Sequence, residues 1–192
     1  MSQSIYRISI QVGLSGYSFK IQTADEIKIS PWMSAERIFS TPEFLNRYDE
    51  VGISVFTPKF TLVPEQFNDH SDMVGMLAPV ADVDGNDEVM TVSVPEFDAV
   101  LVYSNTIGET LSRAVSETVL DKEGNKTRPL PEMYYMLRSV LNLPDYNKIL
   151  ASYMDGVLYL VIAQGRSLLL CNSFQAPDFT TAQYFIFLAM KN

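Results

Sequence analysis

Hydrophobic and polar residues alternate over residues 17–23, where Tyr17, Phe19 and Ile21 are separated by polar side chains. A two-residue period puts one face of a β-strand in a core and the other face in water. Segments 5–12 and 26–30 also read as strands, and Ser15-Gly16 favours a tight turn because glycine tolerates positive φ. The pattern therefore predicts a three-stranded meander near the start of the chain.

The same pattern occurs again over residues 147–170. A constant offset of 140 positions aligns Gly16 with Gly156, Phe19 with Tyr159 and Ile21 with Val161. Asp155-Gly156 and Gln164-Gly165 supply the turns of this second meander, and Asp-Gly is a strong hairpin signal. We interpret the repetition as one fold unit that is used twice.

Between the two meanders the pattern predicts further strands and helices. Strands are expected over 51–56, 60–64, 89–94 and 97–103, the last so apolar that it should be central in its sheet. Helices are expected to begin near Thr41-Pro42, after a capping box at Thr106–Glu109, and over 131–143 before Pro144. The chain is thus expected to belong to the α/β class.

The last predicted helix, residues 180–190, has a capping box at Thr180 and Gln183 and is apolar on all sides from Tyr184 to Met190. A helix of this kind must be covered on more than one face. We expect it to pack on segment 147–175, with its other side covered by another chain or by sequence beyond Asn192.

Composition narrows the class of partner. The 192 residues include 47% hydrophobic and 19% charged residues, enough apolar material for one large domain or two small ones. The net charge of -9 disfavours nucleic acid and anionic membrane surfaces. The longest apolar runs, 157–163 and 184–190, are far shorter than the about 20 residues that span a bilayer. The kind of interaction that we expect is therefore with a protein partner or with another copy of the chain.

The chain has a single cysteine, Cys171, so it forms no intrachain disulfide. A chain of this size without disulfides fits a reducing compartment. The first residues lead directly into the strand pattern and show no apolar signal region. We expect a soluble cytoplasmic protein.

The order of elements, three strands and a helix, more strands and helices, then three strands and a helix again, resembles the actin-like ATPase superfamily, which has two ribonuclease-H-like lobes. The segments 60–65, 98–103, 168–174 and 180–187 are similar to a bacterial family of unknown function that is thought to share this fold. The resemblance implies a first lobe over 1–144 and the start of a second, incomplete lobe over 145–192.

That resemblance also implies a place for chemistry. Actin-like ATPases carry an Asp at the end of the first strand of each lobe, where a carboxylate orients hydrated Mg²⁺ or the attacking water. This chain has Gln11-Val12-Gly13 at the first position and, by the offset, Ala151 at the second. We therefore predict no ATP hydrolysis, no catalytic residue and no cofactor. If a nucleotide cleft survives, its candidate residues are Gln11, Gly13, Ser15, Gly16, Asp155 and Gly156.

Other chemistry-bearing residues have structural explanations. The acidic loop 82–88 has Gly85 at the fourth position, whereas a calcium loop needs glycine at the sixth, so we interpret this loop as a solvated turn. His70 is the only histidine and lies in a polar segment, and Cys171 lies in an apolar strand. No metal site is predicted. Trp32 and Met33 are expected to pack in the core, with an exposed binding anchor as the alternative.

Two functional hypotheses follow. The first is a non-enzymatic interaction or scaffold protein on a degenerate actin-like fold, and the second is a nucleotide-binding protein or weak ATPase or kinase with a non-standard cleft. Gln11 favours the first, because an amide cannot supply the negative charge that the metal requires.

Overall fold

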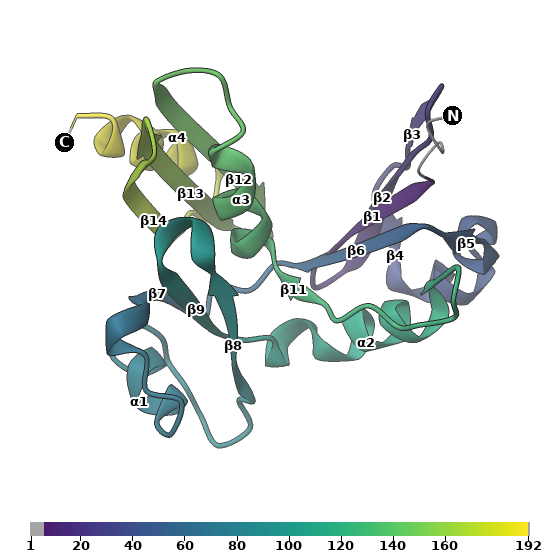
Figure 1. The fold of residues 1–192 in the computed structure, drawn as a ribbon, viewed down its shortest axis with the longest axis horizontal. Coiled ribbons are helices and arrows are strands. Elements are labelled where there is room, and N and C mark those ends of the chain that lie inside the picture. Colours follow the sequence, from purple (N-terminus) through teal and green to yellow (C-terminus); the bar gives the residue numbers. More distant parts are fainter. Residues whose placement is uncertain (1–5, 192) are drawn as a thin grey trace. The chain divides into compact units, whose positions relative to one another are not determined.

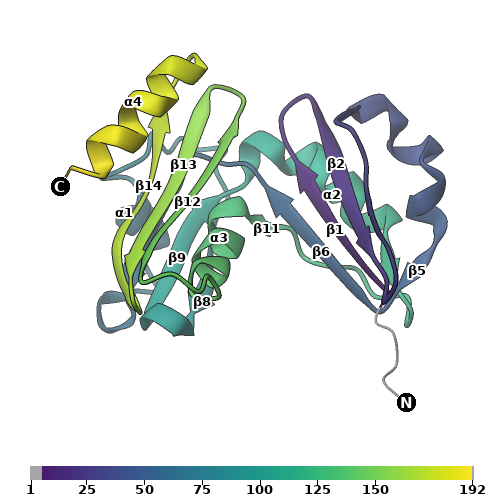
Figure 2. The same ribbon diagram turned by 90° about the horizontal axis from the view of Figure 1, so that it is seen from above.

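The computed structural model describes residues 6–191, with Ile107 described by its backbone alone. The chain forms two compact units that alternate along the sequence, and Figures 1 and 2 show the elements of each. Unit 1 comprises residues 1–56 and 107–132, and unit 2 comprises residues 57–106 and 133–192. The predicted lobes 1–144 and 145–192 are a different kind of division, and they stay a prediction.

Unit 1 is built on a mixed sheet in which β1 is central. β1 pairs antiparallel with β2 and parallel with β6, and β6 pairs parallel with β11. The pairs Val12–Val55 and Val55–Pro131 bring the carboxyl ends of the three parallel strands to one edge of the sheet. The strands are β1 (Arg7–Val12), β2 (Gly16–Gln22), β3 (Ile27–Ile29), β4 (Met33–Ser34), β6 (Glu50–Val55) and β11 (Leu130–Pro131).

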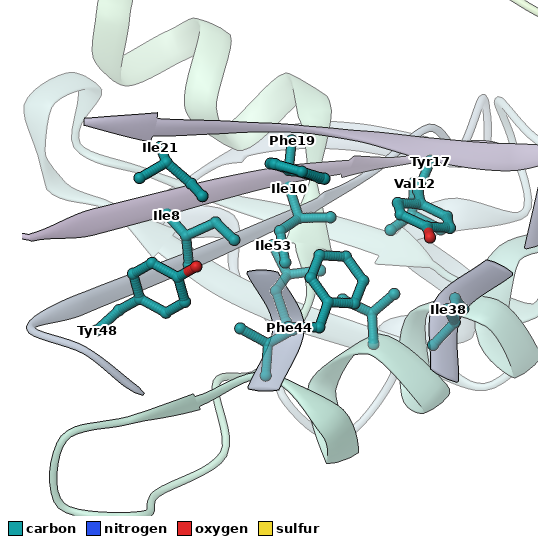
Figure 3. Packing of buried hydrophobic residues seen from close by; sticks show 12 residues of the cluster. Ile8, Ile10, Val12, Tyr17, Phe19, Ile21, Ile38, Phe44, Tyr48 and Ile53 are labelled. Carbon is teal, nitrogen blue, oxygen red and sulfur yellow. The ribbon is translucent and has the colours of Figure 1, made fainter. Parts of the chain in front are cut away.

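Alternation along β1 and β2 creates the core of unit 1, as Figure 3 shows. Ile8 and Ile10 on β1 and Phe19 on β2 are buried, and they pack with Phe44 and with Val115 of α2. The elements that complete this unit are η1 (Ala35–Ser40), η2 (Pro42–Leu45), η5 (Thr106–Gly108), α2 (Glu109–Thr118) and the small pair β5 (Arg47–Tyr48) with β10 (Leu120–Asp121). Residue 5, the predicted start of the first strand, lies outside the described residues.

Unit 2 contains two antiparallel three-stranded sheets. In the first, β13 lies between β12 and β14, and in the second, β9 lies between β7 and β8. All six residues of β9 are buried, which confirms the predicted central strand. The strands are β7 (Phe60–Pro64), β8 (Val89–Val94), β9 (Ala99–Ser104), β12 (Asn147–Met154), β13 (Val157–Gln164) and β14 (Ser167–Gln175).

The helices of unit 2 cover these sheets. Leu77 of α1 packs on β8 and β9, and Ala182 of α4 packs on Leu158 of β13. The helical elements are η3 (Glu65–Phe67), α1 (Met73–Leu77), η4 (Pro95–Phe97), α3 (Glu132–Val140) and α4 (Phe179–Ala189). Within the described residues, no helix combines the length and the apolar character that a membrane span requires.

Two predicted helix starts were wrong, and the helix predicted at Thr41-Pro42 begins there but is a short 3₁₀ helix. The segment after Thr41 forms only the 3₁₀ helix η2, since four residues are too few to propagate an α-helix. Thr106 does not cap α2, because a 3₁₀ turn precedes that helix and Gly108 takes the cap position. Asp178, not Thr180, caps α4, and its carboxylate accepts from the Thr181 amide over 2.8 Å.

The two meanders have the same strand order but different registers. Tyr17 pairs with Val12, whereas Val157 pairs with Met154. Val157 follows Tyr17 by 140 positions, but Met154 follows Val12 by 142, so the constant offset fails across the first turn. The reason is turn length, because four residues, 13–16, separate the paired Val12 and Tyr17, whereas two residues, 155–156, separate Met154 and Val157. The duplication itself stays a prediction.

Candidate functional site

The clearest polar cluster lies where β1, β6 and β11 end. Gln11 on β1 pairs in register with Ser54 on β6, and Glu132 directly follows β11 as the first residue of α3. The Gln11 Nε2 donates to Glu132 Oε1 over 3.2 Å. Ligands of α/β sheets bind outside the carboxyl ends of the strands, so this edge is the place to look for a functional site.

Glu132 is a buried acid, only 9% exposed. Burial raises the pKa of its carboxyl group, while the Ser54 hydroxyl and the Gln11 amide oppose that shift. Ser54 Oγ is itself buried and faces the carboxylate without reaching the geometry of a formed hydrogen bond. Within the part of the chain that the structure describes, no lysine or arginine forms an ion pair with Glu132.

This arrangement limits the chemistry of the cluster. A neutral Glu132 can donate a hydrogen bond, and an ionised Glu132 has an uncompensated charge to offer to a cation. One of its two oxygens is already engaged by the Gln11 amide. Gln11 therefore reads as a partner of Glu132 rather than as a substitute for a metal-binding carboxylate.

The glycine turn after β1 has a packing explanation. The Gly13 amide donates to the Gly16 carbonyl over 2.9 Å and closes the turn. A Cβ atom on Gly16 would lie 2.0 Å from the Met33 carbonyl oxygen, so this position must be glycine for β4 to pair with β2. The Ser15 carbonyl accepts from the Ala35 amide over 3.4 Å. The close approach at Gly16 is thus made by the chain itself.

The structure confirms core packing for Met33 but not for Trp32. Met33 packs against the core of unit 1, as predicted. Trp32 is 38% exposed, so its predicted burial in the core was wrong. Its indole Nε1 lies over Gly16, which leaves much of the ring facing solvent.

The structure does not bring all six candidate residues into one compact unit. Gln11, Gly13, Ser15 and Gly16 lie together in unit 1, whereas Asp155 and Gly156 belong to unit 2. Asp155 and Gly156 have φ angles of 52° and 76° and form the two-residue turn between β12 and β13. These conformations explain the Asp-Gly pair by hairpin geometry.

The register also moves the second acid position. Gln11 pairs with Ser18, and Leu158, which follows Ser18 by 140 positions, pairs with Tyr153 rather than with Ala151. The Tyr153 hydroxyl donates to the Ala176 carbonyl over 2.9 Å. The position in the second meander that matches Gln11 by strand pairing is therefore a tyrosine, which also lacks a carboxylate.

The acidic loop 82–88 is more than a solvated turn. Asp87 accepts from Lys59 Nζ over 2.6 Å and from Ser104 Oγ over 2.7 Å, and its side chain is 1% exposed. These donors, with the Asp84 amide, lower the pKa of Asp87 to about 2. Both oxygens of the Asp87 carboxylate thus already accept hydrogen bonds from the protein itself.

The remaining candidates also have structural surroundings. His70 is exposed and its Nε2 lies 3.0 Å from Asn68 Nδ2. Burial raises the pKa of the Cys171 thiol to about 12, so it is no nucleophile near neutral pH. Across residues 6–191, no group of three or more histidine, cysteine or acidic side chains has an arrangement that could hold a metal ion.

Sequence reasoning missed Glu132 and Ser54. Ser54 lies in a buried strand that was predicted, but nothing in its local pattern distinguishes it. Glu132 follows the two-residue strand β11, which is too short for alternation to show. The only signal was Pro131, which was assigned to the helix and in fact ends β11.

Comparison with known families now identifies the chain. The model of a family described as "Protein of unknown function (DUF3822)" matches residues 2–192. This chain belongs to the DUF3822 family. None of the curated proteins matches it.

Two solved structures share the fold of this DUF3822 chain. One is a protein of Bacteroides thetaiotaomicron described as having an actin-like ATPase fold and unknown function, with a TM-score of 0.68, 16% identity, and coverage of 97% of this chain and 76% of that one. The other is the cytoplasmic domain of EpsL, an inner membrane component of the type II secretion system of Vibrio cholerae. It has a TM-score of 0.52, 12% identity, and coverage of 97% and 75%. The actin-like fold and the resemblance to a family of unknown function are thus confirmed.

Proposed function

We propose that this chain is a non-enzymatic interaction or scaffold protein on an actin-like fold. The observation that carries the proposal is the Gln11–Glu132 hydrogen bond at the end of β1. Phosphoryl transfer depends on a metal and positioned donors that hold dense negative charge. Here the first-strand position is an amide, and the nearest acid is buried and engaged by that amide.

The character of α4 supports a protein partner. This helix carries no charged residue, although the chain has a net charge of -9. Phe179, Tyr184 and Phe187 are each at least 60% exposed on it. Tyr184 and Phe187 are three positions apart and so are neighbours on the helix surface, and exposed apolar surface of this kind is characteristic of protein contacts. EpsL, whose cytoplasmic domain has a similar fold, is a component of a secretion system, and this analogy of fold points the same way.

The proposal includes the lobe organisation and the location. Residues 1–144 form a first ribonuclease-H-like lobe, and 145–192 begin a second one. The support is that β12–β13–β14 repeats the strand order of β1–β2–β3, while β12 lacks, within the described residues, the parallel neighbour that β6 provides for β1. The single cysteine fits a reducing compartment, so a cytoplasmic location belongs to the proposal.

A second candidate function is nucleotide binding, and Glu132 is the observation that favours it. An acid lies at the carboxyl edge of three parallel strands, next to Gln11 and Ser54, where sequence reasoning found none. An ionised carboxylate at this edge would orient a hydrated Mg²⁺.

Thermal melting with and without Mg-ATP separates the two candidates. A ligand at about 100 times its Kd adds about 2.7 kcal/mol to the free energy of unfolding. For a scaffold we expect no rise in Tm with Mg-ATP and no phosphate release, for the natural chain and for Gln11→Ala alike. A Tm rise that disappears in Glu132→Gln but persists in the control Glu36→Gln, an exposed acid of the same unit, would establish the nucleotide-binding function instead.

A further inference from the structure

Unit 2 contains a cavity of about 490 Å³, and no residue of the Gln11 cluster lines it. Its walls come from the end of β7, from the turn between β8 and β9, and from the turn between β13 and β14. The volume falls within the range of about 300–1,000 Å³ that is usual for small-molecule sites. Every residue that lines it belongs to the same compact unit.

Three charged side chains line this cavity, and two of them have hydrogen-bonding capacity that a ligand could use. Among the described residues, neither Arg166 nor Asp98 forms a side-chain hydrogen bond or ion pair. Glu96 is half engaged, since its Oε1 accepts from Arg138 Nε over 3.0 Å. Its Oε2 is buried and has no partner. Because Glu96 Oε2 is closed to solvent, a ligand in the cavity would not reach it, and the charges left for a ligand are those of Arg166 and Asp98.

The backbone holds Asp98 firmly in place. Its φ of 49° lies in the left-handed region, which asparagine and aspartate tolerate better than other side chains apart from glycine. The Asp98 amide donates to the Pro95 carbonyl over 3.2 Å, and the Asp98 carbonyl accepts from the Glu65 amide over 2.9 Å. The carboxylate therefore projects from a fixed turn, which reduces the entropy lost when it binds a ligand.

Most of the other lining residues are apolar. Phe97, Leu168 and Leu62 contribute side chains, and Pro64 and Pro95 complete this part of the wall. A ligand that fits must offer an anionic group to Arg166, a cationic donor to Asp98, and apolar surface to the other lining residues. A mostly apolar lining with a few placed polar groups is the usual character of a ligand site.

We propose that this cavity binds a small zwitterion, namely an amino acid or short peptide with free amino and carboxyl groups and apolar side chains. The Arg166 guanidinium donates to the ligand carboxylate, and the Asp98 carboxylate accepts from its ammonium group. Phe97 and Leu168 contact the side chains. This site is independent of the scaffold function and of any nucleotide at the Gln11 cluster.

The test is calorimetric titration of the chain with the dipeptide leucyl-leucine near pH 7. We compare it with the N-acetyl and the C-terminal amide forms, which lack the ammonium and the carboxylate respectively. We expect measurable binding of the free dipeptide and a loss of about tenfold or more in affinity for either capped form.

Variants assign each end of the ligand. Arg166→Gln should remove the preference for the free carboxylate, and Asp98→Asn, which suits the left-handed turn, should weaken the preference for the free ammonium. Arg37→Gln, at an exposed arginine in unit 1, should change nothing. Retained Tm in each variant shows that the fold is intact. Absence of binding up to about 10 mM, or binding that none of the variants alters, would overturn the proposal.

Discussion

Gln11 Nε2 and Glu132 Oε1 lie 3.2 Å apart and join the end of β1 to the first turn of α3. The two residues are 121 positions apart in sequence, and only the parallel pairing of β1, β6 and β11 brings them together. A buried carboxylate with an amide partner and without a cation makes the stability of unit 1 depend on pH.

Glu132→Gln should stabilise the protein at neutral pH. Because burial raises the folded-state pKa of Glu132 above its ordinary value of 4.5, the native state binds more protons, and this contribution to stability falls as pH rises from that value through the folded pKa. The variant should match the natural chain near pH 4 and exceed it by about 1–2 kcal/mol at pH 8. Urea unfolding at both pH values measures the difference, and Glu36→Gln serves as the exposed control. Equal stability at pH 8 would mean that the carboxylate is hydrated.

Asp87→Asn should destabilise the protein at pH 7 by about 2–4 kcal/mol, because it leaves Lys59 with no charged partner. The folded pKa of Asp87 is about 2, below its ordinary 3.8, so this stabilisation is complete above that ordinary value and is lost as pH falls toward 2. Denaturation at pH 7 and pH 2.5 should show the gap between the two proteins shrink. Asp82→Asn, in the same loop and exposed, is the matched control.

Gly16→Ala should cost about 3 kcal/mol, since the new methyl group meets the Met33 carbonyl oxygen at 2.0 Å and must displace backbone. Gly85→Ala is the same substitution where nothing lies within 4 Å of the added atom, and it should change stability by less than about 0.5 kcal/mol. Chemical denaturation compares the two. Similar losses at both positions would show that β4 yields easily.

Substitutions of Phe185 and Phe187 on α4 should differ in their effect on the free energy of unfolding. Phe185 stacks on Phe174 with ring centroids 4.8 Å apart, so Phe185→Ala should cost about 2–3 kcal/mol. Phe187 is 62% exposed, so Phe187→Ser should leave the free energy of unfolding within about 0.5 kcal/mol. Size-exclusion chromatography of the Phe187 variant then reports whether this face drives self-association. A large stability loss at Phe187 would mean that another part of the chain covers it.

The Cys171 thiol should react slowly with a thiol reagent at pH 8. Burial raises its pKa to about 12, so the reactive thiolate is scarce in the folded protein. We expect labelling at least about tenfold slower than in urea, with the absorbance of the released thiol as the readout. Equal rates in both states would place the thiol at the surface.

Much of the fold was predictable because some strands alternate apolar and polar residues and others are continuous apolar runs. The pattern of Tyr17, Phe19 and Ile21 predicted β2, and the apolar run before Ser104 predicted β9 as a central strand. The registers were beyond sequence reasoning, because they depend on turn lengths. Turns of four and two residues at equivalent places shifted the second acid position from Ala151 to Tyr153.

The candidate site was predictable only in part. Gln11 was found because a missing acid is visible in sequence, whereas its partner Glu132 was not, since β11 is two residues long. Asp87 was assigned to a solvated turn because its loop is polar, yet it is buried by contacts with Lys59 and Ser104. In both cases a residue distant in sequence determines the environment of the side chain, and the local sequence pattern does not indicate that residue.

The alternation of the two units along the chain has a consequence for how the protein can be divided. The chain passes from one unit to the other three times, after residues 56, 106 and 132. A cut between Thr106 and Ile107 would yield two fragments, each with part of both units and neither with a whole one. Neither unit can therefore be moved into another protein as one continuous segment. Two fragments produced by this cut could regain structure only if they associated and completed both units together.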